Sequence, residues 1–170
     1  THATLNHVMK RNNIPRRTAA QTNKIRFYNS PLSFTPKKNL TTKEKQLKTA
    51  GLMLYWAEGS KRSAHSADFA NSDSKMIRIF CQFIRKICQV DEKRFRASLY
   101  CYPSHNIKKL TQYWSHLTKI PLSQFYQPYV RSDGGHIRDK MKHGLLHVRY
   151  SDKRLLKLIL KEIKHLSYNL

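Results

Sequence analysis

The sequence predicts an α+β domain in which helices cover one face of a mostly antiparallel sheet. Two segments, 95–102 and 143–150, alternate between apolar and polar residues with the period of a half-buried strand. Around them lie segments in which apolar side chains recur every three or four residues, as in amphipathic helices. Strands with one polar face and helices with one apolar face pack most simply as a helical layer on one side of a sheet.

The charge of the chain points to a polyanionic partner. Its 170 residues include 33 Lys and Arg against 10 Asp and Glu, a formal net charge of +23. So many positive charges repel one another in the folded state. Binding to phosphates neutralises them and releases counterions, which makes nucleic acid the expected partner. No apolar run approaches the roughly 20 residues of a membrane span, and no signal-peptide pattern opens the chain, so no membrane partner is expected. The odd, low count of three cysteines favours reduced thiols in an intracellular protein. Together with the charge, it leads us to expect that the protein is located with DNA.

The first 28 residues are expected to form a basic helical segment, and residues 29–40 a linker. Apolar residues recur at helical spacing from Leu5 to Met9, and the helix stops at a proline. Two further prolines and a pair of lysines are typical of a linker. Residues 41–170 then form the main domain.

The main domain is expected to begin with a helix that leads to Glu58. Thr41 and Glu44 have the spacing of a capping box, in which each side chain satisfies a backbone N–H of the other residue. The remaining elements each show the period of a helix or a strand. They are, in order, a strand over 65–71, a helix from Asn71 or Ser72 to about Gln89, the strand over 95–102, a helix from Ser104 to Leu117, an edge strand over 124–131 interrupted by Pro128, the strand over 143–150, and a helix from Ser151 to about Leu166.

The most informative stretch runs from Lys48 to Ser60. After nine residues without a charge, Glu58 stands where the helix must end, and Gly59 follows it. A carboxylate at the tip of a packed helix is well placed to hold a divalent metal. The alternative interpretation is a buried helix that ends in an ordinary glutamate with a glycine C-cap.

This stretch resembles the nine-residue motif of the LAGLIDADG homing endonuclease family. Residues 51–59 align with the motif without gaps. Leu54, Ala57 and Gly59 match it, and Glu58 stands in place of the catalytic aspartate. The resemblance covers residues 41–168 and is strongest to free-standing, single-motif members found with a DNA-binding helix-turn-helix.

Three further segments bear on this resemblance. Met53 replaces the motif glycine at the contact between helices, and Trp56 replaces an acid. Residues 69–73, before a predicted helix, look like the first strand of the family and its exit. Residues 1–18 resemble the recognition helix and exit of a helix-turn-helix; a basic amphipathic helix packed on the main domain is the alternative.

The resemblance implies a saddle-shaped sheet lying along double-stranded DNA and a homodimer. Two motif helices would pack at a two-fold axis, and Glu58 of each chain would hold Mg²⁺ in a paired site that the chains share. Lys140 or Lys142 would stabilise the transition state, and the choice between them stays open. The dimer interface would include Gly51, Met53, Leu54 and Ala57.

Cationic and aromatic residues on the polar strand faces, on the basic N-terminal segment and after the motif helix are expected to contact DNA. Arginine and lysine would bind phosphates or guanine, and the other side chains would reach base edges. The expected contacts are Arg16, Arg17, Lys61, Arg62, Arg94, Arg96, Tyr100, Tyr102, His147 and Arg149.

The sequence therefore predicts a site-specific endonuclease that makes Mg²⁺-dependent double-strand cuts. A non-catalytic DNA-binding transcriptional regulator on the same fold is the first alternative, and Met53 and Trp56 at motif positions favour it. The two differ in whether Glu58 binds metal. An RNA-binding maturase is a further alternative, although the chain has no RNA-specific aromatic signature.

Overall fold

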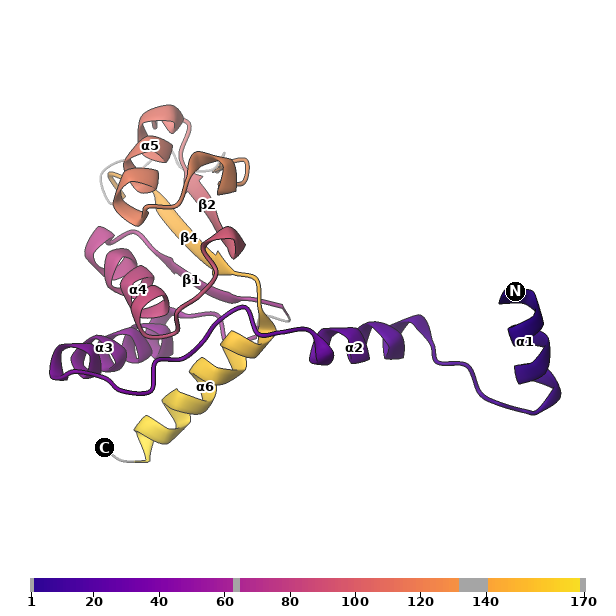
Figure 1. Cartoon of the computed structure of the whole chain (residues 1–170). Coiled ribbons are helices and arrows are strands. Elements are labelled where there is room, and N and C mark those ends of the chain that lie inside the picture. Colours follow the sequence, from indigo (N-terminus) through magenta and orange to yellow (C-terminus); the bar gives the residue numbers. More distant parts are fainter. Residues whose placement is uncertain (1, 63–64, 132–140, 169–170) are drawn as a thin grey trace. The chain divides into compact units, whose positions relative to one another are not determined.

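The computed structural model describes residues 2–62, 65–131 and 141–168, with the backbone alone at residues 2 and 3. The chain divides into two compact units, Thr1–Leu32 and Ser33–Leu170 (Figure 1). Among the helices of the described residues, none has both the length and the apolar character needed to cross a membrane.

The N-terminal unit consists of two helices, α1 (His2–Arg11) and α2 (Ala19–Asn29). The separate second helix was not expected within the basic segment, yet its start has a sequence signal. The Thr18 side chain accepts a hydrogen bond from the Gln21 N–H, and the Gln21 side chain accepts one from the Thr18 N–H, which completes a capping box. No described side chain of α1 or α2 is buried.

The C-terminal unit is an α+β domain built on a four-stranded mixed sheet, so the expected fold class is confirmed at that level. The strand order is β1-β4-β2-β3; β4 runs antiparallel to β1 and β2, and β3 runs parallel to β2. The elements are α3 (Thr42–Glu58), β1 (Ala67–Asn71), α4 (Ser74–Lys86), the 3₁₀ turn η1 (Glu92–Arg94), β2 (Phe95–Cys101), α5 (Ile107–Thr118), the 3₁₀ turn η2 (Leu122–Gln124), β3 (Tyr129–Val130), β4 (Leu145–Tyr150) and α6 (Lys153–Ser167).

The core lies between the sheet and the helices, and the predicted alternation of the strands is confirmed. Phe69, Ala97 and Val148 are fully buried on three neighbouring strands. Phe80 of α4 stacks on Phe69 with ring centroids 4.6 Å apart. Figure 1 shows α4 and α5 on one side of the sheet, so the alternate residues of each strand are left on the opposite side. We call that second side the open face; its residues are Asp68, Ala70, Arg96, Ser98, Tyr100, Leu145, His147 and Arg149.

Several boundaries differ from the sequence prediction because side-chain caps start the helices later. Asp73, Asn106 and Asp152 are the N-caps of α4, α5 and α6, and each side chain accepts a backbone N–H of the first turn. The edge strand expected over 124–131 is reduced to the two residues of β3, with η2 before it. Before β3 the segment makes only an isolated bridge, between Phe125 and Ala97, and Pro128, which has no N–H for a ladder bond, separates this bridge from β3.

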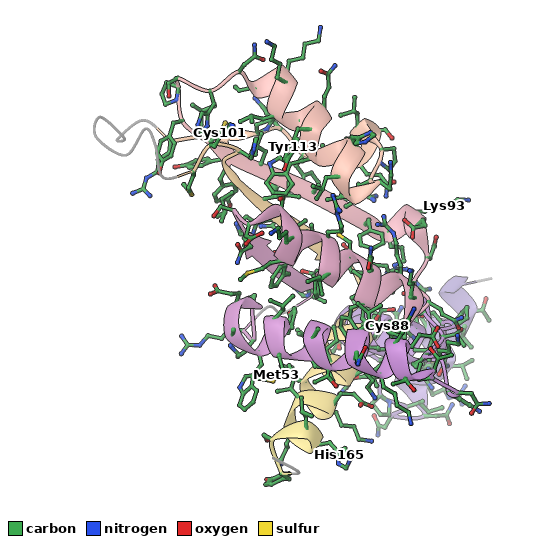
Figure 2. All side chains as sticks on the ribbon, turned by 90° about the vertical axis from the view of Figure 1, so that its left-hand side faces the viewer. Met53, Cys88, Lys93, Cys101, Tyr113 and His165 are labelled. Atoms are coloured by element: carbon green, nitrogen blue, oxygen red, sulfur yellow. The ribbon has the colours of Figure 1, made fainter. Side chains whose placement is uncertain are left out.

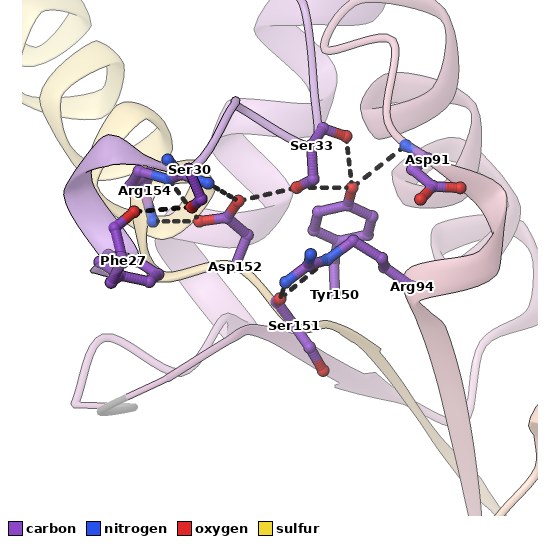
Figure 3. A network of polar contacts seen from close by, with 9 residues as sticks. All are labelled: Phe27, Ser30, Ser33, Asp91, Arg94, Tyr150, Ser151, Asp152 and Arg154. Carbon is purple, nitrogen blue, oxygen red and sulfur yellow. Dashed lines mark hydrogen bonds and ion pairs between the residues drawn. The ribbon is translucent and has the colours of Figure 1, made fainter. Parts of the chain in front are cut away.

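The expected linker over 29–40 is wrong in its second half. Phe34 is 6% exposed and forms a bridge with Val90. Figure 3 shows Ser33 in a polar network: its hydroxyl donates to Asp152 at 2.7 Å, and its carbonyl oxygen accepts from the Tyr150 hydroxyl at 2.6 Å. The hydrogen bonds and the buried ring of Phe34 attach this segment to the C-terminal domain, which therefore begins at Ser33.

Candidate functional site

The end of α3 is held in place by a buried tyrosine. The Tyr55 hydroxyl donates to the Ser60 carbonyl oxygen at 2.8 Å and accepts from the Asp68 N–H at 3.3 Å. The Gly59 N–H donates to the Tyr55 carbonyl oxygen at 2.9 Å, and Gly59 forms a bridge with Phe69 of β1. Burial raises the pKa of Tyr55 to about 12, so the hydroxyl keeps its proton and remains a donor. These contacts fix the backbone on both sides of Glu58.

Gly59 is required here for space rather than for a left-handed backbone. Gly59 is the C-cap of α3, as the alternative interpretation expects, but its φ of −74° is open to any residue, so the cap is not the left-handed type that favours glycine. A Cβ atom at this position would lie 2.5 Å from the Tyr55 ring and from the Tyr55 carbonyl oxygen. The glycine thus lets the chain turn closely against Tyr55 directly after Glu58.

Among the acidic residues that the structure describes, Glu58 differs in having no partner within the described part of the chain. Of the ten acidic residues, Asp133 and Asp139 lie outside the described part of the chain, and seven of the other eight form helix caps or ion pairs. Glu58 is exposed and has no hydrogen bond or ion pair to any residue that the structure describes. The seven engaged residues are Glu44, Asp68, Asp73, Asp91, Glu92, Asp152 and Glu162.

One face of α3 is exposed and apolar. Met53 is 41% exposed and Trp56 is 39% exposed, while Ala57 is exposed beside them. Figure 2 shows Met53 on the outer side of α3. Leu54, expected in a dimer interface together with Met53 and Ala57, is half-buried at the border of this face.

Gly51 does not belong to this exposed face, so its expected place in a dimer interface is wrong. It is buried, and a Cβ atom built on it would lie 2.2 Å from the Phe83 ring of α4. The missing side chain allows α3 to approach α4 within the same chain.

Three residues of the open face form a connected cluster. Nε of Arg149 donates to Oδ2 of Asp68 at 2.7 Å, and Nδ1 of His147 lies 3.1 Å from Oδ1. Burial raises the pKa of Asp68, but the hydrogen bonds with His147 and Arg149 outweigh it and hold the pKa below its usual value. The ring centroids of His147 and Tyr100 lie 4.6 Å apart, and those of Tyr100 and Tyr129 5.1 Å apart. The expected DNA contacts Tyr100, His147 and Arg149 are thus brought together.

Other predicted contacts are placed differently. Arg96 stands opposite Arg149 in the sheet and is half-buried, and it completes a row of charged side chains with Asp68. Arg94 lies in η1, outside the strand, and Nε donates to the Ser151 carbonyl oxygen at 3.2 Å (Figure 3). Tyr102 is 6% exposed, so its expected DNA contact is wrong. It follows β2, where the strand ends and its alternation no longer holds.

The remaining predicted residues lie apart from the cluster. Lys61 and Arg62 are exposed just after α3, and Lys142 is exposed just before β4. Arg16 and Arg17 are exposed in the N-terminal unit, in the extended chain between its two helices. Lys140, the other expected catalytic cation, lies outside the described residues.

Within one chain, the described His, Cys, Asp and Glu side chains form no group of three that could hold a metal ion. Comparisons with protein-family models, with curated proteins and with solved structures give no match to this chain.

Sequence reasoning missed Asp68 as a member of the site. Its position on the polar side of a strand was visible, because Ala67 and Phe69 mark the opposite face. The pairing of Asp68 with Arg149 was not visible in the sequence, since the two residues are 81 positions apart and meet only through the strand order.

Proposed function

We propose that this protein is a DNA endonuclease that acts as a homodimer on a LAGLIDADG-like fold and uses Mg²⁺. The observation that carries the proposal is Glu58, an exposed carboxylate without a partner among the described residues, held at the end of α3 beside an apolar face. An exposed acid with no cap or ion pair among the described residues is open to a ligand outside the chain.

The residues at the end of α3 fit a hard divalent cation. Mg²⁺ prefers oxygen ligands and takes one or two carboxylates, with phosphate and water completing its shell. The carbonyl end of α3 carries a partial negative charge that adds to the attraction of Glu58 for a cation. A bound Mg²⁺ would supply an activated water and stabilise the leaving oxygen of a phosphodiester. Tyr55 and Gly59 support the proposal by fixing the backbone that carries the carboxylate.

The apolar face of α3 supports the homodimer. A second copy packed on Met53, Trp56 and Ala57 would cover large side chains that water now contacts. Because Met53, Trp56 and Ala57 lie near the end of α3, the same packing would bring together the ends of the two helices, which carry Glu58. A paired site made in this way needs only one acid from each chain.

Duplex DNA as the substrate is supported by the charge and by the open face. The net charge of +23 favours binding to phosphates. The open face adds Arg96, Arg149, His147 and Tyr100, which are side chains that can bind phosphates and base edges.

A non-catalytic DNA-binding regulator is the second candidate function. Met53 and Trp56 are bulky where two copies of α3 would meet. If they hold the helices apart, the two copies of Glu58 are too distant to share a metal. DNA binding would then persist without cleavage.

Selection followed by cleavage tests the proposal. Duplexes bound by the protein are first enriched from a randomised library without divalent metal, with structured RNA as a competitor. The enriched duplexes are then incubated with Mg²⁺ and either the wild type or E58Q. We expect discrete double-strand cuts by the wild type and binding without cuts by E58Q. Binding without cuts by both proteins would favour the regulator, and preference for the RNA would contradict DNA as the substrate.

A further inference from the structure

We infer that Asp68 is a positioning residue that holds Arg149 and His147 ready to read base edges of duplex DNA, with Arg149 directed at guanine. The inference rests on the proposed function, because it takes the open face of the sheet as the surface that meets DNA. It adds a source of sequence specificity that the charge alone does not provide.

A carboxylate is unexpected on a face that binds phosphates. Each negative charge there repels the DNA backbone and weakens binding at any sequence. Asp68 is the one acid among the eight residues of the open face, where it stands in one row with Arg149 and Arg96. Its presence is explained if ordering the cations contributes more than the repulsion costs.

The geometry gives each oxygen of Asp68 one partner. Oδ2 accepts from Nε of Arg149 at 2.7 Å, and Oδ1 lies 3.1 Å from Nδ1 of His147. The Asp68 side chain is 15% exposed, whereas that of Arg149 is 31% exposed. The carboxylate therefore lies deeper in the face than the guanidinium that it holds, and Arg149 is the member of the pair that a ligand reaches more easily.

Asp68 binds Nε of Arg149, and the Tyr100 side chain also interacts with the guanidinium. The other N–H donors of a guanidinium are on its two Nη atoms, and such a pair donates to O6 and N7 of guanine in the major groove. No other base pair edge presents the same two acceptors to a planar fork of donors. Arg149 is thus suited to guanine and less suited to the remaining bases.

His147 is oriented by the same carboxylate. With Nδ1 donating to Asp68, Nε2 is the ring nitrogen that remains for a ligand. The Tyr100 ring, 4.6 Å away between centroids, limits the rotation of the imidazole. Asp68 and Tyr100 together leave His147 one orientation toward the DNA.

An arginine side chain that is ordered before DNA binds contributes more to sequence discrimination than to overall affinity. An unrestrained arginine must lose its rotamer freedom on binding, and it can equally well swing to a phosphate. A guanidinium already held by Asp68 loses less freedom at a guanine and has less reach to the backbone. Removal of the carboxylate should therefore lower sequence discrimination while it leaves or raises affinity for unrelated duplexes.

The test is selection of duplexes from a randomised library, without divalent metal, by the wild type, D68N, R149K and E92Q. E92Q is the matched control, because it also neutralises one acid paired with an arginine, Arg85, on another surface. We expect the wild type and E92Q to enrich the same sequence with a guanine at one position. We expect D68N and R149K to lose discrimination at that position by about tenfold or more, with affinity for unrelated duplexes unchanged or higher.

Other outcomes separate this inference from the proposed function. Selection of the same guanine with undiminished strength by D68N would overturn the role of Asp68 and leave the endonuclease proposal intact. Asp68 would have a purely structural role if D68N lost stability and all DNA binding together while R149K retained the guanine preference. D68E keeps the carboxylate and should retain the preference, which guards against a folding defect in D68N. Failure of the wild type to bind duplex DNA would overturn both proposals.

Discussion

The Tyr55 hydroxyl donates a hydrogen bond to the Ser60 carbonyl oxygen across 2.8 Å, so the last turn of α3 and the residue after Gly59 are tied together. Tyr55 is fully buried, and it anchors this turn to the core. Glu58 lies between the two tied positions and is itself exposed. The chain therefore fixes the backbone at Glu58 while leaving the carboxylate open to a ligand.

The lack of space between Gly59 and the Tyr55 ring should make G59A destabilising. The added Cβ would lie 2.5 Å from the ring, and both the ring and the chain must shift. We expect a loss of about 1–3 kcal/mol in the free energy of unfolding, as for other overpacked sites. Urea unfolding followed by circular dichroism measures it. S60A, which changes an exposed neighbour, should stay within about 0.5 kcal/mol of the wild type, and an equal loss in both variants would contradict the steric account.

At the end of α3, the sequence predicts the position of Glu58 but not the packing of Gly51 and Gly59. The position of Glu58 at the end of a helix follows from the run of uncharged residues before it. The separate reasons for Gly51 and Gly59, contact with Phe83 and with Tyr55, depend on tertiary packing that no local pattern encodes. The resemblance therefore implies Gly51 in a dimer interface, whereas the residue packs within its own chain.

The lowered pKa of Asp152 predicts that the stability of the folded protein depends on pH. Burial raises its pKa, but hydrogen bonds from Arg154 and Ser33 outweigh it and lower the pKa in the folded state. The stabilisation is therefore complete above the unfolded pKa of about 3.9 and is lost as the pH falls through the lower folded pKa. D152N should cost about 1–2 kcal/mol at pH 7, and less at pH 3.

Unfolding of the wild type and D152N across pH 2–7 measures this difference. D73N is the matched control, since Asp73 is an exposed N-cap and asparagine caps a helix about as well as aspartate. A D152N deficit that stays constant down to pH 2 would contradict the linkage.

The cysteines should resist thiol reagents in the folded protein. Cys81 and Cys88 are buried, and burial raises the pKa of each thiol to about 12. Cys101 is also buried with a raised pKa. At pH 8 the reactive thiolate of the first two is then about one part in ten thousand. Ellman's reagent should react with all three thiols quickly in 6 M urea and slowly without it; fast labelling of the folded protein would contradict the burial.

The exposed apolar face of α3 should control self-association. W56E places a charge on the proposed contact between two copies and should convert a dimer to a monomer, because a buried unpaired charge is costly. Sedimentation velocity in 0.5 M salt measures the species and limits nonspecific contacts. Q46E changes an exposed residue two turns or more toward the start of the same helix and should leave the dimer unchanged. Identical sedimentation of W56E and the wild type would place the dimer contact elsewhere.

Much of the fold was predictable because its strands are amphipathic. Segments 95–102 and 143–150 alternate in the sequence, and both become central strands with the expected residues inside. The edge strand was predicted too long, since the segment before Pro128 makes only an isolated bridge to β2 and the ladder is limited to β3. The cluster around Asp68 required the register between β1 and β4, which depends on the whole sheet.

The central claim is that two copies of this chain each contribute Glu58 to one metal-dependent cut. Mixed dimers test it most directly: wild-type and E58Q chains carry different affinity tags, and dimers containing one of each are purified in two steps. Each dimer is incubated with Mg²⁺ and a supercoiled plasmid that contains the selected site. We expect linear product from the wild type, none from E58Q, and only nicked or uncut plasmid from the mixed dimer. Linearisation by the mixed dimer at half the wild-type rate or more, or a wild-type dimer that binds the site and never cuts it, would contradict the claim.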